Sequence, residues 1–231
     1  MKLATDKAHR DYFYKHGVIE FDALFTPDQV REMNVTIDNI LCKNLGIRRD
    51  QLVRQSPQEI FLHGRDLYRE DEALKKHVLH RRLAEIAVEL TEARSLRIGY
   101  EQLFVGETKE PLIENVYNQF LHQEGTLQNK SCITPVVCGL MLCLEPATFP
   151  EIPPALFPKT AGSGVFFKPD LPFDLTFLSH AQGGRYLLIV YAHPRTVYIL
   201  NDNDPHTHAL KHKGYVFGDK LSDKLNPLIY R

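Results

Sequence analysis

A series of short apolar runs between residues 96 and 200 does most to decide what this chain can fold into. The runs are rich in β-branched and aromatic residues, and Gly, Pro and Asn separate them, which is the pattern of consecutive strands joined by turns. They cover residues 96–105, 115–122, 134–145, 163–169, 175–180, 185–192 and 196–200. Such a series with irregular linkers predicts two sheets packed face to face, as in a sandwich or a jelly roll.

The residues before this series indicate helices. The segment Thr26-Pro27-Asp28-Gln29 offers an N-cap, a proline in the first turn and a capping-box glutamine, and apolar residues then recur at helical spacing. We therefore predict a helix over residues 27–44. An apolar stripe opposite a charged face predicts a second helix over residues 72–90. A short helix ended by Gly17, followed by a strand over residues 18–21, completes the N-terminal half.

The apolar runs 134–145 and 185–192 do not alternate cleanly with polar residues, so we expect both faces of these strands to be covered. This predicts an α+β fold: a double-stranded β-helix, or cupin-like jelly roll, with N-terminal helices packed on one sheet. The 231 residues, 43% of them hydrophobic, fit a single domain. Residues 1–95 would form its mainly helical part, and residues 96–231 its jelly-roll core and C-terminal tail. The Pro-rich stretch 145–164 predicts a surface loop.

Charge and composition exclude several classes of protein. The net charge is −1 and the basic residues are scattered, so we expect no nucleic-acid partner. The charged N-terminus has no signal-peptide core and no run is long enough to span a bilayer, which predicts a soluble, cytoplasmic protein with no membrane partner. The four cysteines form no CxxC pair and favour buried free thiols. No Walker loop, GxSxG or strand-linked GxGxxG is present.

One short stretch, QFLHQEG, carries residues that can bind a metal ion. On a β-strand, His122 and Glu124 would point to the same face, while Gln123 would point away. An imidazole with a carboxylate suits ferrous iron, and a set of two histidines and one carboxylate leaves open positions for an oxidant and a cosubstrate. The alternative is a polar patch on an exposed sheet face, because any HxE in a strand gives the same geometry.

The order of the segments around HQE resembles the phytanoyl-CoA dioxygenase family of Fe(II)/2-oxoglutarate oxygenases. A helical half opening with YFYKHGVIEF comes first, HQE follows an apolar run, and VFFKPDLPFDLTF leads to Arg185. The resemblance implies Fe(II) held by His122 and Glu124, with 2-oxoglutarate bound by Arg185 and Thr176 and a supporting role for Gln123. A guanidinium suits this task because it makes paired, charge-assisted hydrogen bonds to a carboxylate. The alternative is an Arg185 that bridges a local Asp or Glu.

The sequence departs from the family pattern at two places. The acid of the family's HxD is Glu124 here, one methylene longer, and no histidine stands where the second one should precede the arginine. The expected position falls at or beside Phe173 and Asp174, so Asp174 is our candidate for the third metal ligand. His180 is the other candidate, at the far end of the same run. In the plainer interpretation Phe173 belongs to the core and Asp174 is a turn acid.

These residues support three hypotheses about function. In the first, the chain is an oxidoreductase: an Fe(II)/2-oxoglutarate-dependent dioxygenase that hydroxylates a small organic substrate, as the resemblance implies. The second is a catalytically silent relative that keeps the fold and binds a small ligand without metal chemistry. The third is a cupin-like metal enzyme that uses no 2-oxoglutarate. The substrate would be chosen by loops whose shape composition does not predict.

Overall fold

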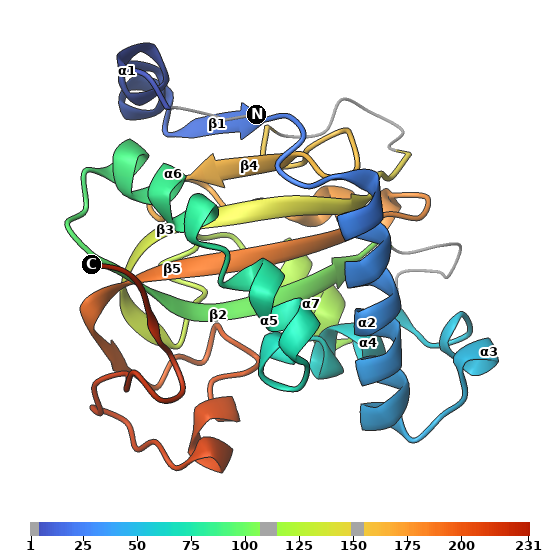
Figure 1. The fold of residues 1–231 in the computed structure, drawn as a ribbon. Coiled ribbons are helices and arrows are strands. Elements are labelled where there is room, and N and C mark those ends of the chain that lie inside the picture. The colour runs from blue at the N-terminus through green and yellow to red at the C-terminus, as the bar shows by residue number, and fades with distance from the viewer. Residues whose placement is uncertain (1–4, 107–114, 149–154) are drawn as a thin grey trace.

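The computed structural model describes residues 5–106, 115–148 and 155–231, and a six-stranded antiparallel sheet lies at its centre (Figure 1). The strand order is β1-β4-β3-β5-β2-β6. The strands are β1 (Val18–Phe21), β2 (Leu96–Val105), β3 (Ile133–Glu145), β4 (Gly164–Phe167), β5 (Arg185–Tyr198) and β6 (Leu228–Tyr230). The longest strands, β3 and β5, are central, and the short strands β1 and β6 form the two edges.

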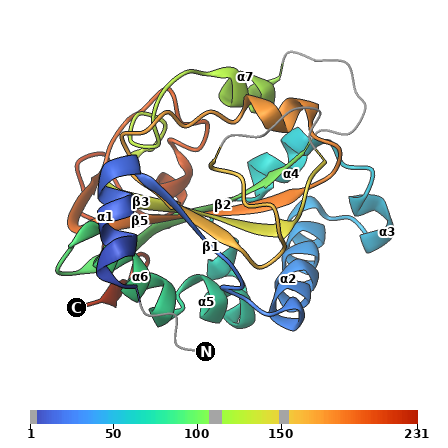
Figure 2. The same ribbon diagram turned by 90° about the horizontal axis from the view of Figure 1, so that it is seen from above.

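Helices cover both faces of this sheet. They are α1 (Lys7–His16), α2 (Pro27–Leu45), α3 (Arg49–Leu52), α4 (Pro57–His63), α5 (Glu72–Val78), α6 (Arg81–Thr91) and α7 (Val116–His122), with the 3₁₀ turns η1 (Leu67–Arg69), η2 (Thr176–His180) and η3 (Ala209–Lys213). Figure 2 shows α1, α2, α5 and α6 on one side of the sheet, and α4, α7 and long loops on the other. In the ranges described, no helix combines the length and apolar character required to cross a bilayer.

The side chains of β5 alternate between two cores, one on each face of the sheet. We call the core between the sheet and α1, α2, α5 and α6 the helix-side core; Leu187 and Ile189 point into it. The loop-side core lies between the sheet, α7 and the loops, and receives Tyr186 and Leu188. Both faces of the strand are therefore covered, as its unbroken apolar run predicts.

The N-terminal predictions are largely confirmed. The helix predicted over 27–44 is α2, and its capping box is present: the Thr26 hydroxyl accepts from the Gln29 amide and the Gln29 side chain accepts from Thr26 N. Gly17 ends α1 in the left-handed conformation, at φ 73°, where glycine carries no steric cost. The helix predicted over 72–90 is interrupted, because His80 has extended backbone and caps α6. All four cysteines are free; Cys42 alone is only half-buried.

The predicted strands over 115–122 and 175–180 are wrong. The first forms helix α7, where the side chain of Asn115 caps the helix by accepting from Asn118 N at 2.8 Å. Its apolar residues Tyr117, Phe120 and Leu121 recur at helical spacing, and they form the buried side of the helix. The second forms the 3₁₀ turn η2, while runs 185–192 and 196–200 join into the single strand β5. The centre of the predicted loop 145–164, residues 149–154, lies outside the described residues.

These differences change the architecture. The described residues form one curled antiparallel sheet, half of a barrel, and α7 with its loops takes the place where the second sheet of a double-stranded β-helix is predicted. The α+β class and the helices packed on one face are confirmed. The fold is consistent with a cupin-like half-barrel, with the concave side closed by a helix, a 3₁₀ turn and irregular segments.

Candidate functional site

A cavity of about 540 Å³ opens beside the C-terminal end of α7. It is lined by Leu121, His122, Gln123, Glu124, Gly125, Thr126, Asp170, Pro172, Phe173, Asp174 and Thr176. Two segments distant in sequence meet here, because Phe173 N donates to Gly125 O at 2.8 Å and Thr126 forms an isolated antiparallel bridge with Pro172. The structure therefore brings five of the six predicted site residues to one cavity and leaves Arg185 out.

His122 and Glu124 reach this cavity from a helix end and not from a strand. His122 is the last residue of α7, and Gln123 follows it with extended backbone. The strand geometry assumed for HxE is therefore wrong, although both side chains, which are exposed, line the cavity. Gln123 is held by a hydrogen bond from its Nε2 to Asn203 Oδ1 at 2.6 Å, which ties the end of α7 to the C-terminal segment.

Asp174 and Thr176 are bonded to each other across a tight turn. Asp174 Oδ1 accepts from Thr176 N at 3.0 Å and from Thr176 Oγ1 at 2.6 Å, which is the local side-chain to backbone pattern of turn residues. Phe173 is only 1% exposed and stacks on Phe167 with ring centroids 5.6 Å apart. Both observations match the plainer interpretation of this segment, a core phenylalanine followed by a turn acid.

Arg185 lies on the opposite face of the sheet. As the first residue of β5 it shares the face of Leu187 and Ile189, and its Nη1 is 2.9 Å from Asp38 Oδ1 on α2 and 3.8 Å from Glu145 Oε1. It lines a separate cavity of about 480 Å³ on the helix side. Its cosubstrate role stays a prediction that this placement does not favour, and the alternative of a bridge to local acids is the arrangement observed.

Sequence reasoning missed Lys130, which lies directly behind the cavity. Its side chain is buried, and its Nζ donates to Phe120 O at 3.2 Å and Phe173 O at 3.3 Å. The nitrogen is also 5.1 Å and 5.7 Å from the centroids of the two phenylalanine rings. Burial lowers the pKa of Lys130 to about 8, with the nearby Asp174 carboxylate opposing the effect. In the sequence, NKS has the composition of an ordinary polar turn, so no pattern marks this lysine.

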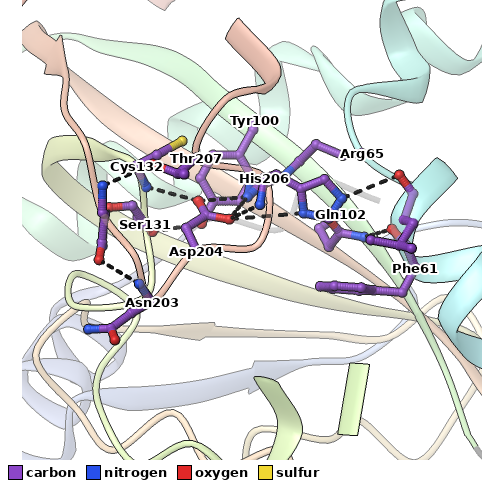
Figure 3. Close-up of polar contacts among 12 residues, drawn as sticks. Phe61, Arg65, Tyr100, Gln102, Ser131, Cys132, Asn203, Asp204, His206 and Thr207 are labelled. Atoms are coloured by element: carbon purple, nitrogen blue, oxygen red, sulfur yellow. Dashed lines mark hydrogen bonds and ion pairs between the residues drawn. The ribbon is translucent and has the colours of Figure 1, made fainter. Parts of the chain in front are cut away.

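A buried ionic network holds the segment that carries Lys130 (Figure 3). Asp204 is its centre: both carboxylate oxygens are 2.8 Å from Arg65 Nη2, and they also accept from Cys132 N and His206 N. Although burial alone would raise the pKa of Asp204, Arg65 holds it below its ordinary value. Burial first, and Arg65 second, lower the pKa of His206 to about 4, so this imidazole is neutral.

The C-terminal segment next to Asp204 continues this support. Asn201 Nδ2 donates to Asn129 O at 2.8 Å and to Ser131 O at 2.9 Å, and the Ser131 hydroxyl lies 2.6 Å from Tyr100 Oη on β2. The residues on both sides of Lys130 are therefore fixed by hydrogen bonds. The network positions the lysine and does not itself line the cavity.

The residues of the cavity wall are a poor match to a metal ion with 2-oxoglutarate. Among the residues that the structure describes, no group of three or more His, Cys, Asp or Glu is placed to hold a metal ion. Within the described ranges, the cavity lining contains three carboxylates, Glu124, Asp170 and Asp174, with His122, and it includes no arginine or lysine. As arranged, this set does not fit Fe(II) with a dianionic cosubstrate.

No family model matches the chain, and no curated protein matches it. Solved structures do. The non-heme α-ketoglutarate-dependent carbocyclase SnoK from nogalamycin biosynthesis superposes with a TM-score of 0.66 at 14% identity, covering 97% of this chain and 96% of that one. The epimerase SnoN from the same biosynthesis gives 0.67 at 13% identity, over 97% and 98%. CytC3, solved with Fe(II) and α-ketoglutarate, gives 0.58 at 13% identity, over 86% and 81%.

At these identities the likeness is one of fold. The similar structures are non-heme α-ketoglutarate-dependent enzymes, the general class to which the resembled family belongs, and SnoN was also solved with Fe³⁺, α-ketoglutarate and nogalamycin RO. No family model supports the narrower assignment to phytanoyl-CoA dioxygenases. The chain thus shares the fold of these α-ketoglutarate-dependent enzymes.

Proposed function

We propose that this protein binds a small neutral or cationic organic ligand in the cavity beside α7, on an oxygenase-type fold, without iron and 2-oxoglutarate chemistry. The observation that carries this proposal is the charge of the cavity wall. Glu124, Asp170 and Asp174 line it, and no guanidinium or ammonium stands among the lining residues that the structure describes. This corresponds to the silent relative among the three hypotheses.

Electrostatics supports a ligand that is not an anion. 2-Oxoglutarate carries two carboxylates, and placing it beside three more in a partly enclosed site costs free energy unless a cation compensates. Arg185, the residue suited to that task, is paired with Asp38 in the helix-side core. An amine or a neutral polar molecule meets no such penalty and finds hydrogen-bond acceptors in the same carboxylates.

The candidate metal ligands also argue against a role in iron chemistry. One oxygen of Asp174 is occupied by two hydrogen bonds from Thr176, and Phe173 takes the position where the family pattern expects a histidine. Binding a metal ion through this oxygen would break both bonds. Each is worth on the order of 1 kcal/mol.

The test is a binding experiment with matched ligands. Thermal unfolding should be shifted upward by small neutral or cationic compounds, such as alkylamines and amino alcohols, and not by dicarboxylates of equal size. Glu124→Gln and Asp174→Asn should weaken cationic ligands, while Asp202→Asn, an exposed acid outside the lining, should not. Tighter binding of dicarboxylates than of amines would contradict the proposal.

A second candidate is the Fe(II)/2-oxoglutarate-dependent oxygenase acting on a small organic substrate. The observation that favours it is that His122, Glu124 and Asp174 line one cavity, in a fold like that of α-ketoglutarate-dependent enzymes. These residues would hold the iron, which with its cosubstrate supplies oxidation of an aliphatic C–H bond. The third hypothesis, a metal enzyme without 2-oxoglutarate, would use the same ligands.

One anaerobic titration separates these candidates. If the oxygenase is right, Fe(II) with 2-oxoglutarate should give the visible charge-transfer band of the chelate, Glu124→Ala should abolish it, and succinate should form in air. Under our proposal neither band nor succinate appears. Retention of a stoichiometric metal ion without the band would instead favour the metal enzyme that uses no 2-oxoglutarate.

A further inference from the structure

Lys130 is a buried cation without a carboxylate partner. The ion pairs of the described residues do not include it, although its side chain is only 1% exposed. Its polar partners are the two neutral carbonyls of Phe120 and Phe173. Burying an ammonium in this way is costly, because carbonyls replace only part of its hydration and no opposite charge lies within bonding distance.

The surroundings of Lys130 raise the fraction of its neutral amine above that of an ordinary lysine. Two aromatic rings and the loop-side core exclude water, and burial lowers the pKa of this lysine to about 8. The carboxylate that acts on it is Asp174, on the segment before η2, and His122, Glu124 and Asp170 line the same cavity as Asp174. At neutral pH the uncharged fraction of Lys130 is about 300-fold larger than that of an ordinary lysine. An unprotonated lysine is a nucleophile.

The wall between Lys130 and the cavity is thin. Gly125 and Phe173 line the cavity and also adjoin the lysine. A β-carbon placed on Gly125 would lie 3.7 Å from Lys130 Cε, so at this point only glycine backbone stands beside the side-chain stem. To react with a molecule in the cavity, the ε-amine has to give up its hydrogen bonds to Phe120 O and Phe173 O, which are 3.2 and 3.3 Å long.

We propose that Lys130 forms a Schiff base with a small neutral aldehyde or ketone held in the cavity beside α7. The proposal deepens the proposed function and rests on it, since it names the ligand class of the same cavity. The neutral Nζ attacks the carbonyl carbon, a C–N bond forms and the C–O bond breaks. The oxygen leaves as water with the two hydrogens that the nitrogen gives up. Once protonated, the imine is a cation that Asp174 stabilises.

Reductive trapping of the full-length protein tests this step. The protein is incubated at pH 7 with butyraldehyde and sodium cyanoborohydride, and the alkylated lysines are identified by peptide mass spectrometry. Because its neutral fraction is larger, Lys130 should be modified at least about 10-fold faster than exposed lysines. Its rate should reach half its maximum near pH 8. The anionic aldehyde glyoxylate should label it more slowly than butyraldehyde.

Two variants serve as controls. Lys130→Met keeps an apolar side chain of similar length and removes the amine, so the fast adduct should disappear. Lys168→Met removes a half-buried lysine that donates to Tyr14 O and lines a different cavity, and it should leave labelling of Lys130 unchanged. If Lys130→Met does not fold, the pH profile and the glyoxylate comparison on the wild-type protein still decide the question.

The outcomes separate this inference from the proposed function. Labelling of Lys130 no faster than that of exposed lysines, in a protein whose unfolding temperature is raised by amines or neutral ligands, would overturn the Schiff base and leave the binding function standing. If no neutral or cationic compound binds and Lys130 is also not preferred, both proposals fail. Selective, pH-dependent trapping at Lys130 supports both.

Discussion

The lowered pKa of Lys130 makes the stability of the fold depend on pH. Its pKa falls from an ordinary 10.5 to about 8 on folding, so the unfolded chain binds the proton more tightly than the folded one. Between these two pH values the unfolded state therefore carries more protons, and the free energy of unfolding contributed by this residue rises with pH. The total rise over this window is about 3 kcal/mol.

The corresponding measurement is urea unfolding of wild type and Lys130→Met between pH 7.5 and 10.5. We expect the free energy of unfolding of the wild type, relative to that of Lys130→Met, to rise with pH across this range. The difference between the wild type and Lys168→Met should stay constant. Parallel curves for wild type and Lys130→Met would show that the lysine titrates as an exposed one.

Single residues were the hardest part of the site to predict from sequence. His122, Glu124, Asp174 and Thr176 were identified and do meet at one cavity, although the strand geometry used to join the first two was wrong. Lys130 was missed because its burial is a consequence of tertiary packing, and nothing local distinguishes a buried lysine from a solvated one. Arg185 was assigned to the concave side, but its face is fixed by the register of β5.

At the level of elements, the segment around Asp204 joins three parts of the chain. Arg65 follows α4, Cys132 precedes β3, and the carboxylate of Asp204 bonds to both from the C-terminal segment. Arg65 and Asp204 have side chains only 8% and 1% exposed. Removing one charge of such a buried pair leaves the other without compensation.

Asp204→Asn should therefore lower the free energy of unfolding by about 3 kcal/mol. Urea denaturation at pH 7 measures the change, and the exposed Asp202→Asn should stay within about 0.5 kcal/mol of the wild type. Because Asn201 and Asp204 hold the segment around Lys130, the Asp204 variant should also slow trapping of that lysine. A loss below about 1 kcal/mol would mean that the network is not an important support.

Elements with strong local signals were predicted well. The capping box at Thr26 and Gln29 marked the start of α2, and Gly17 marked the end of α1. The run 115–122 was misassigned because a short apolar, aromatic stretch has the composition of a strand and the spacing of a helix at once. The cap at Asn115 was the local signal that favoured a helix.

On the scale of the whole molecule, contacts of the C-terminal tail with residues 68–99 support our proposal that residues 1–231 form one domain. Arg97 Nη1 on β2 donates to Leu221 O and Asn226 O, and Asn226 Nδ2 donates back to Gly99 O. Tyr68 Oη donates to Leu225 O. The C-terminal tail is thus bonded to the helical half and to the central sheet together.

A single cooperative unfolding transition is expected from this arrangement. The chain has no tryptophan and ten tyrosines, so tyrosine fluorescence can be compared with far-ultraviolet circular dichroism. The two midpoints should coincide in urea. Separate transitions would indicate that the N-terminal helices and the sheet unfold independently.

The class of the fold was more predictable than its topology. The change from helical to strand-like runs near residue 96 correctly indicated helices packed on an antiparallel sheet. The number of sheets could not be predicted from the sequence. A second sheet forms only if its segments pair with one another, and this pairing depends on tertiary contacts that local composition does not specify.

The strand order also bears on how the protein behaves at high concentration. An unpaired strand edge is a template on which another molecule can add a strand, and the risk grows with the length of the edge. Here the long strands β3 and β5 lie inside the sheet, and its edge strands β1 and β6 have four and three residues. Beyond β6, residues 64 and 66 are hydrogen-bonded to the outer edge of β2. The arrangement leaves little exposed backbone for edge-to-edge aggregation.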